Sequence, residues 1–218
     1  MSLKKKLIEI CHKVYEKGFV TAYDGNISAR TDNNSILITR SGKCKGEITV
    51  DDLIEIDLYR GIIGGEAKIS TENKIHLLAY SKRSDVNSVV HCHPAYSTAF
   101  SLTGEGLVTH YLPEVILTLG KVPLCKFAIP STDQVPESML PYIDFAWAML
   151  LENHGAVTFG KDIYDAYYKM EKLEHAAKII FLARQIGKPN KLSDEVVKKL
   201  YDMAESTYGM KPDERNIF

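Results

Sequence analysis

Three histidines in the sequence have the type and spacing expected of a metal site. His91 and His93 are two residues apart and follow the apolar pair 89–90. Residues two apart on a strand point to the same face, so both imidazoles can reach one metal ion from one side. His154 ends a second apolar segment, and Gly155 beside it permits a sharp turn or a close backbone approach. The three histidines predict an open, catalytic type of zinc site with a position left for water or substrate.

A closed structural zinc site is the less favoured alternative. Such sites have four ligands, commonly cysteines, and no two of the four cysteines stand at C-x-x-C spacing. A lone histidine is more often structural than a ligand. We therefore expect surface or interface roles for His12 and His175, expect a structural role for His76, and leave His110 unassigned.

Three short polar segments could bind an anion. They are 25–28, 39–42 and the pair Ser70 and Thr71. A helix is expected to begin at Ser70, and the free N–H groups and dipole of a helix N-terminus favour an anion. Each segment alone is also typical of a turn or a helix cap. Glu72 follows directly; a carboxylate in a first turn is ordinary helix chemistry, but beside a metal and a phosphate it becomes a candidate general base.

The elements that must position these side chains follow from apolar periodicity. We predict one α/β domain over residues 1–218, with mixed strands flanked by helices, and a turn region at 61–65. The predicted strands are 26–30, 35–39, 53–58, 88–92, 122–128, 148–153 and 156–159. The predicted helices are an opening helix before Gly18, then 70–83, one from Pro94, one from Asp133, 162–186 and 193–206.

Composition limits the class of function. Hydrophobic residues make up 45% and charged residues 25% of the chain, as in an ordinary soluble domain. The formal net charge of −1 lacks the basic excess of a nucleic-acid binder. No apolar run approaches a signal peptide or the ~20 residues that span a bilayer. We expect a cytoplasmic protein with reduced thiols and no membrane or nucleic-acid partner.

Taken together, these motifs resemble the class II aldolase/adducin family along nearly the whole chain. The matching segments are 25–30, 38–42, 70–72, 89–93 and 153–155. The resemblance implies a three-layer sandwich with a central, mostly antiparallel mixed sheet between helices. It also implies Zn²⁺ on His91, His93 and His154, with Glu72 as a further ligand and catalytic residue. The implied phosphate-binding residues are Asn26, Ser41, Gly42, Ser70 and Thr71.

Segments 109–111 and 206–209 resemble the fuculose-phosphate aldolases within that family. By this resemblance Tyr111 is a catalytic proton donor contributed across a subunit interface, and Tyr208 lies in a C-terminal tail that covers the substrate. The implied assembly is a homotetramer with sites between subunits. Arg40 stands where a proline is expected, and Asn73–Lys74 replaces an aromatic–basic pair, so the sugar end of the substrate could differ from fuculose.

The implied reaction is reversible cleavage of a ketose 1-phosphate into dihydroxyacetone phosphate and an aldehyde, with Glu72 acting at C3 and Tyr111 at the alkoxide. Aldolases for rhamnulose 1-phosphate or a 5-deoxypentulose 1-phosphate stay open, and three other classes are less favoured alternatives. Pentulose-phosphate 4-epimerases tend to carry aspartate in place of Glu72, and methylthioribulose-1-phosphate dehydratases share the metal ligands. An adducin-like interaction module would show a degraded histidine triad, whereas this chain retains all three histidines and the glutamate.

Overall fold

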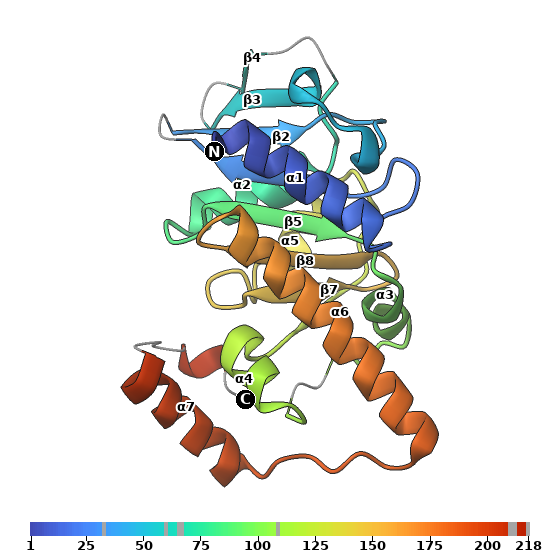
Figure 1. Cartoon of the computed structure of the whole chain (residues 1–218), viewed down its shortest axis with the longest axis vertical. Coiled ribbons are helices and arrows are strands. Elements are labelled where there is room, and N and C mark those ends of the chain that lie inside the picture. Colours follow the sequence, from blue (N-terminus) through green and yellow to red (C-terminus); the bar gives the residue numbers. More distant parts are fainter. Residues whose placement is uncertain (32–33, 59–60, 65–67, 108–109, 209–212, 217–218) are drawn as a thin grey trace.

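A single twisted sheet forms the middle layer of the protein (Figure 1). The computed structural model describes the chain apart from residues 32–33, 59–60, 65–67, 108–109, 209–212 and 217–218. Within this part, eight strands follow the order β4-β3-β2-β1-β5-β8-β7-β6. They are β1 (Asn26–Arg30), β2 (Ser35–Thr39), β3 (Leu53–Asp57), β4 (Gly61–Gly64), β5 (Ser88–Cys92), β6 (Leu124–Cys125), β7 (Ala148–Leu151) and β8 (Gly155–Gly160). Only β6 and β7 pair in parallel, which confirms a mixed, mostly antiparallel sheet.

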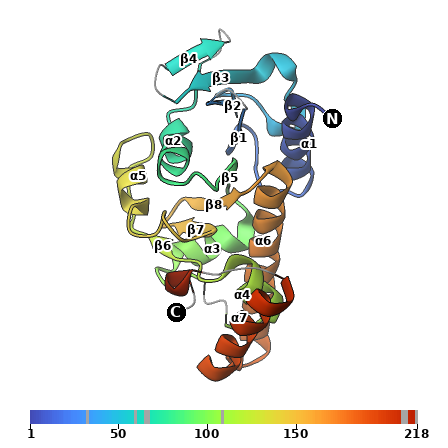
Figure 2. The ribbon, with the colours of Figure 1, turned by 90° about the vertical axis from the view of Figure 1, so that its left-hand side faces the viewer.

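Helices cover both faces of the sheet (Figure 2). One face carries α1 (Leu3–Glu16) and the long α6 (Ile163–Ile186), and the other carries α2 (Asn73–Lys82) and α5 (Gln134–Met139). Beyond these lie α3 (Ala95–Leu102), α4 (Pro113–Leu119), α7 (Asp194–Tyr208) and short 3-10 helices at Lys45–Glu47, Val50–Asp52 and Glu214–Asn216.

The two sheet faces bury separate apolar clusters, and strand alternation decides which side chains reach each one. Along β5, Val90 and Cys92 pack in the cluster beneath α1 and α6, whereas Val89 packs in the cluster beneath α2 and α5. His91 shares the pleat of Val89 and therefore faces the α2 layer. Cys92 is fully buried in the opposite cluster, which confirms that it points away from the predicted metal site.

Four elements differ from the sequence-based prediction. Residues 61–64 form edge strand β4 rather than a turn, and α4 was not predicted. Strand β6 is far shorter than 122–128: Pro123 before it has no N–H for a ladder, and Phe127 N after it donates to the Glu152 side chain rather than to a strand. Helix α2 begins at Asn73, because the Ser70 hydroxyl accepts from Glu72 N in a local turn and places Glu72 at the N-cap position.

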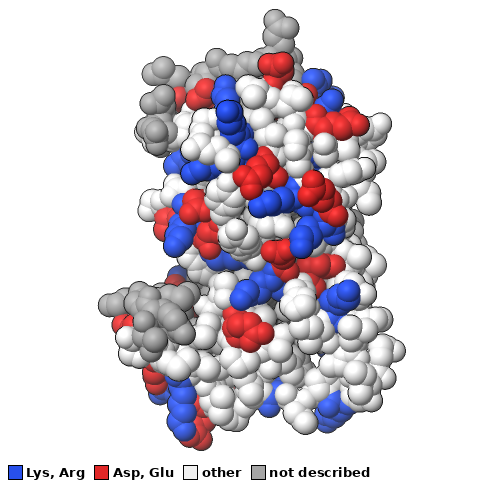
Figure 3. Space-filling model, viewed as in Figure 1, with Lys and Arg blue, Asp and Glu red and all other residues white. Residues whose placement is uncertain are grey.

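All four cysteines are free thiols, as expected. Among the described residues no helix has the length and apolarity to cross a membrane. On the face shown in Figure 3, basic and acidic side chains are intermixed and form no large area of one sign. This surface agrees with the absence of a basic excess in the sequence.

Candidate metal centre

The three predicted histidines meet at one end of the sheet. His91 lies in β5, His93 directly follows that strand, and His154 lies in the turn between β7 and β8. Strands β5 and β8 are paired, with His91 opposite Val157. The turn before β8 and the C-terminal end of β5 therefore lie side by side, at the strand ends in the middle of the sheet. One nitrogen from each of the three rings lies within 4.8 Å of the others.

The geometry of this donor set fits a divalent metal. His91 Nδ1 lies 2.9 Å from the Ala156 carbonyl oxygen and donates to it, which leaves the Nε2 lone pair for a metal. His91 Nε2 and His93 Nε2 are 3.3 Å apart. Ligands at the usual zinc–nitrogen distance in a tetrahedral site are separated by about 3.3–3.4 Å. One histidine pair therefore has the ligand spacing of a tetrahedral site, and the three imidazoles together could hold a metal with one position left open.

Glu72 lies directly beside the histidines. Its Oε1 is 3.0 Å from His154 Nε2 and its Oε2 is 3.5 Å from His91 Nε2. Burial alone would raise the pKa of Glu72, but the contacts with His154 and His91 outweigh it and hold that pKa well below its usual range. Burial would lower the pKa of His91, yet the Glu72 carboxylate raises it. The carboxylate is therefore placed to serve as a ligand or as a base.

His93 has a different environment. Burial, followed by the charges of His91 and His154, lowers its pKa to about 4. Its Nδ1 lies 3.8 Å from Asp24 Oδ2, which is longer than a direct hydrogen bond. The sequence analysis did not single out Asp24, although its position next to the segment 25–28 was a usable signal.

The predicted phosphate-binding residues lie in adjoining segments. Asn26 Nδ2 donates to Glu72 Oε2 over 2.8 Å, which joins the start of β1 to the segment that carries Ser70 and Thr71. Ser41 N donates to the Lys68 carbonyl over 2.9 Å, so the loop containing Gly42 runs beside the same segment. Arg40 pairs with Asp52 at 3.5 Å, so this departure from the family pattern has a partner away from the histidines.

Thr71 and the two predicted tyrosines have other surroundings. Thr71 Oγ1 donates to Ser131 Oγ over 2.6 Å. In a single chain Tyr111 is partly buried against the apolar cluster beneath α1 and α6. The structure shows no contact between Tyr111 and the three histidines. The side chain of Tyr208 at the end of α7 lies outside the described residues, as does Thr109.

Gly155 is required by a close approach between the two ligand segments. A Cβ at this position would lie 2.5 Å from His93 Cδ2 and 2.6 Å from the Cys92 carbonyl oxygen. Gly155→Ala is therefore expected to displace the His93 ring and to weaken metal binding by at least about tenfold, as loss of ligand orientation does. A competition titration with a chromogenic chelator measures the change. Gly187→Ala is the matched control, since a Cβ there has nothing within 4 Å.

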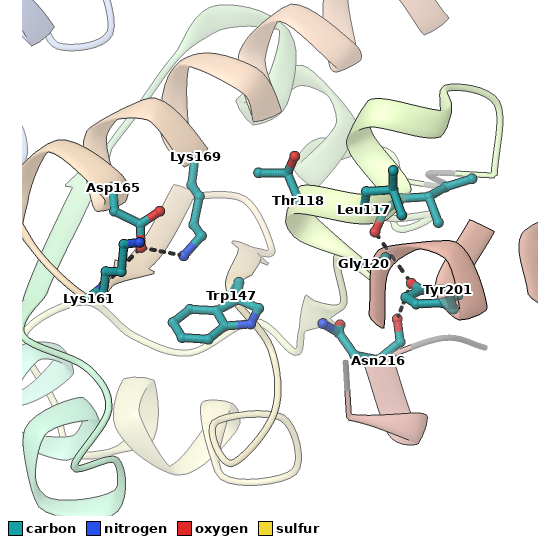
Figure 4. Close-up of a pocket in the computed structure, with 11 residues that line it drawn as sticks. Leu117, Thr118, Gly120, Trp147, Lys161, Asp165, Lys169, Tyr201 and Asn216 are labelled. Carbon is teal, nitrogen blue, oxygen red and sulfur yellow. Dashed lines mark hydrogen bonds and ion pairs between the residues drawn. The ribbon is translucent and has the colours of Figure 1, made fainter. Parts of the chain in front are cut away.

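A cavity of about 320 Å³ lies between α4, α6 and α7 (Figure 4). Its most unusual group is Lys169, whose pKa is lowered, mainly by burial. Lys169 Nζ donates to Asp165 Oδ2 and to the Phe159 carbonyl over 2.8 and 3.1 Å, and it lies 3.7 Å from the centre of the Trp147 ring. These contacts satisfy the ammonium group, and none of the predicted site residues lines this cavity.

Comparison with known proteins agrees with this geometry. Residues 5–181 match the model of the class II aldolase and adducin N-terminal domain. The chain is 31% identical to a 3-oxo-tetronate 4-phosphate decarboxylase of Haemophilus influenzae, over 92% of this chain and 96% of the relative. It is 34% identical to an L-fuculose phosphate aldolase of Methanococcus maripaludis, over 82% of this chain and 96% of the relative.

The fold shows the same relationship. A solved L-fuculose 1-phosphate aldolase superposes with a TM-score of 0.85 at 29% identity, covering 94% of this chain and 96% of that one. The resemblance inferred from the motifs is thereby confirmed. The chain belongs to the class II aldolase and adducin family, and it is an enzyme of the metal-dependent class II aldolase type.

Proposed function

We propose that the protein is a zinc-dependent aldolase that cleaves L-fuculose 1-phosphate, or a closely related ketose 1-phosphate, into dihydroxyacetone phosphate and L-lactaldehyde. The observation that carries the proposal is the position of the Glu72 carboxylate, which lies 3.0 Å from His154 Nε2 and 3.5 Å from His91 Nε2. Polar segments suited to a phosphate adjoin it. The aldolase relative, 34% identical, supports the same reaction.

The reaction breaks the C3–C4 bond of the ketose. The C4 hydroxyl gives up its proton and becomes the aldehyde, while C3 keeps the electron pair and then accepts a proton. A bound zinc ion supplies the Lewis acid that polarises the C2 carbonyl and stabilises negative charge on its oxygen. Glu72 delivers the proton to C3 and removes it in the reverse direction, and Tyr111 exchanges the proton of the C4 oxygen.

The remaining residues bind and enclose the substrate in this proposal. Phosphate on Asn26, Ser41, Gly42, Ser70 and Thr71 fixes C3 beside Glu72, which reduces the entropic cost of reaching the reactive geometry. Tyr208 covers the sugar. Tyr111 packs against the apolar cluster beneath α1 and α6, and we propose that it acts at the site of a neighbouring subunit in a homotetramer. The protein acts in the cytoplasm.

Decarboxylation of a 3-oxo-tetronate 4-phosphate is the second candidate, and the decarboxylase relative at 31% identity favours it. The two reactions share a phosphate-bearing fragment. In both, a carbon next to a carbonyl keeps the electron pair of a broken C–C bond and is then protonated to give dihydroxyacetone phosphate. They differ in the group that leaves, which is an aldehyde or CO₂. Only the aldol cleavage needs an acid–base group at a hydroxyl oxygen.

The first experiment measures release of dihydroxyacetone phosphate from L-fuculose 1-phosphate by chelator-stripped protein, with and without added zinc. Zinc-dependent release supports the aldolase. A parallel assay offers 3-oxo-tetronate 4-phosphate and follows CO₂. Zinc-dependent CO₂ release with no cleavage of the ketose would replace the aldolase by the decarboxylase. If neither substrate reacts while zinc binds stoichiometrically, both proposals fail, and the epimerase and dehydratase substrates are the next to test.

Tyr111→Phe separates the two steps of the proposed mechanism. We expect cleavage of the ketose to fall by about 10²–10⁴-fold, the usual contribution of a general acid or base. Exchange of the C3 hydrogen of dihydroxyacetone phosphate with D₂O should persist, since that step involves no C4 oxygen. Tyr15→Phe, a partly exposed tyrosine on α1, is the control. Equal loss of exchange and cleavage would assign Tyr111 another role.

A further inference from the structure

A run of hydrogen bonds leads from Glu72 into the core. Asn26 Nδ2 donates to Glu72 Oε2, and the side-chain oxygen Oδ1 of Asn26 lies 2.5 Å from His76 Nε2. On the far side of the ring, Ser28 Oγ lies 2.6 Å from His76 Nδ1 and 2.7 Å from the Tyr80 hydroxyl. We call these four residues, Asn26, Ser28, His76 and Tyr80, the relay. All four are buried, with exposed fractions between 0% and 4%.

The donor and acceptor of every bond in the relay follow from its first member. A carboxylate that acts as a base is ionised, and an ionised carboxylate only accepts, so the amide nitrogen of Asn26 must face Glu72. The amide oxygen then faces His76, which has to donate from Nε2. Neutral His76 with a proton on Nε2 accepts at Nδ1 from the Ser28 hydroxyl. The Ser28 oxygen in turn accepts from Tyr80.

The relay connects the two elements that frame the site. Asn26 and Ser28 belong to β1, where Asn26 is the register partner of His91 on β5, whereas His76 and Tyr80 lie on α2, the helix that follows Glu72. Burial lowers the pKa of His76 to about 3, so the ring is neutral. An amide does not pass protons readily between its nitrogen and oxygen. The relay therefore fixes orientation and does not conduct protons to Glu72.

We propose that His76 is a positioning residue whose Nε2–H locks the Asn26 amide and, through it, the Glu72 carboxylate. This inference rests on the proposed role of Glu72 as the base. With Oε2 held by Asn26, the other oxygen of Glu72 stays directed at His154 and the open metal position. Without the His76 donor, the Asn26 amide can rotate, and the carboxylate loses its fixed orientation.

Two variants distinguish loss of the His76 Nε2–H donor from loss of the imidazole ring itself. His76→Gln places an amide N–H where Nε2 stands, and His76→Met has similar length and no donor. We expect His76→Met to lower kcat by about 10–100-fold, the usual cost of losing an outer partner of a metal site. The zinc content should change little. His76→Gln should retain most of the wild-type kcat. Equal losses in both variants would overturn the proposal.

A spectroscopic measurement tests the relay without any turnover. Proton–nitrogen correlation spectra of zinc-loaded protein with isotope-labelled histidine distinguish the two neutral tautomers and the imidazolium, and the His76 signals are those missing from His76→Gln. A neutral ring protonated on Nε2 supports the relay; an Nδ1–H tautomer or an imidazolium overturns it, whatever the turnover of the variants. If the wild type cleaves no ketose phosphate, the proposed function fails, while these signals still decide the direction of the relay.

Ser28→Ala and Ser88→Ala form a second matched pair. Both serines are almost fully buried in neighbouring strands, but only Ser28 contacts His76. We expect Ser28→Ala to lower kcat more than Ser88→Ala does, at similar thermal stability, because it removes the donor to Nδ1. Equal kcat values in the two variants would contradict a role for the Ser28 hydroxyl and hence for the relay.

Discussion

Replacing His154 by alanine is expected to abolish stoichiometric zinc binding and to lower kcat/KM for the sugar phosphate by at least about 10³-fold. A metal that polarises a carbonyl contributes several kcal/mol to the transition state, and about 1.4 kcal/mol corresponds to a factor of ten. Two imidazoles do not replace a three-nitrogen site. His154 is the suitable target because it lies in a turn with a partly exposed side chain, whereas the side chain of His91 is fully buried.

Zinc content after gel filtration and kcat/KM of the same sample measure the effect, with thermal unfolding as the test of folding. His175→Ala is the matched control, because this histidine is exposed on α6 and lies outside the cluster. The control should keep both zinc and activity. A His154→Ala protein that retained one tightly bound zinc per chain at wild-type turnover would remove His154 from the metal site.

The gathering of the three histidines could be predicted because most of their pattern is local. Two histidines on one face of a strand need only the alternation of side chains, and the strand 88–92 has the predicted bounds. Strands 26–30 and 35–39 were also predicted with their observed bounds, since a polar turn separates two short runs of suitable residues. Placing His154 required one additional assumption, that it lies at the same strand ends as His93. The pairing of β5 with β8 shows that it does.

The elements that were missed carry weak local signals. Strand β4 contains glycine at both ends and lies at the sheet edge. Its composition is therefore typical of a turn. Helix α4 has only seven residues, too few for a periodic pattern to stand out. Secondary structure at such positions is decided by the neighbouring chain segments, which a local pattern does not contain.

The orientation of Glu72 is the part of the site that no pattern in the sequence contains. Its partner Asn26 is 46 residues away, and the two meet only because β1 lies beside β5 and beneath α2. The sequence analysis assigned Asn26 to the phosphate and His76 to a structural role. In the folded chain the two side chains are hydrogen-bonded to one another, and Asn26 is almost fully buried.

Replacing Glu72 by glutamine is expected to lower kcat by about 10²–10⁴-fold, because the amide cannot accept the C3 proton. Zinc should still bind, since the three imidazoles remain. The amide has nearly the same shape as the carboxylate, so the change removes a proton acceptor without opening a cavity. Glu137→Gln, an exposed glutamate on α5, is the control and should behave as the wild type.

Exchange of the C3 hydrogen of dihydroxyacetone phosphate with D₂O tests the assignment more directly than turnover does. This exchange needs the metal and the base but no aldehyde, so it should fall in Glu72→Gln as steeply as cleavage does. It should survive in Tyr111→Phe, which acts at a different oxygen. If Glu72→Gln exchanged the hydrogen at the wild-type rate with its zinc in place, another group would be the base. If the variant lost its zinc, Glu72 would be an essential ligand and its role as the base would need the exchange measured at saturating metal.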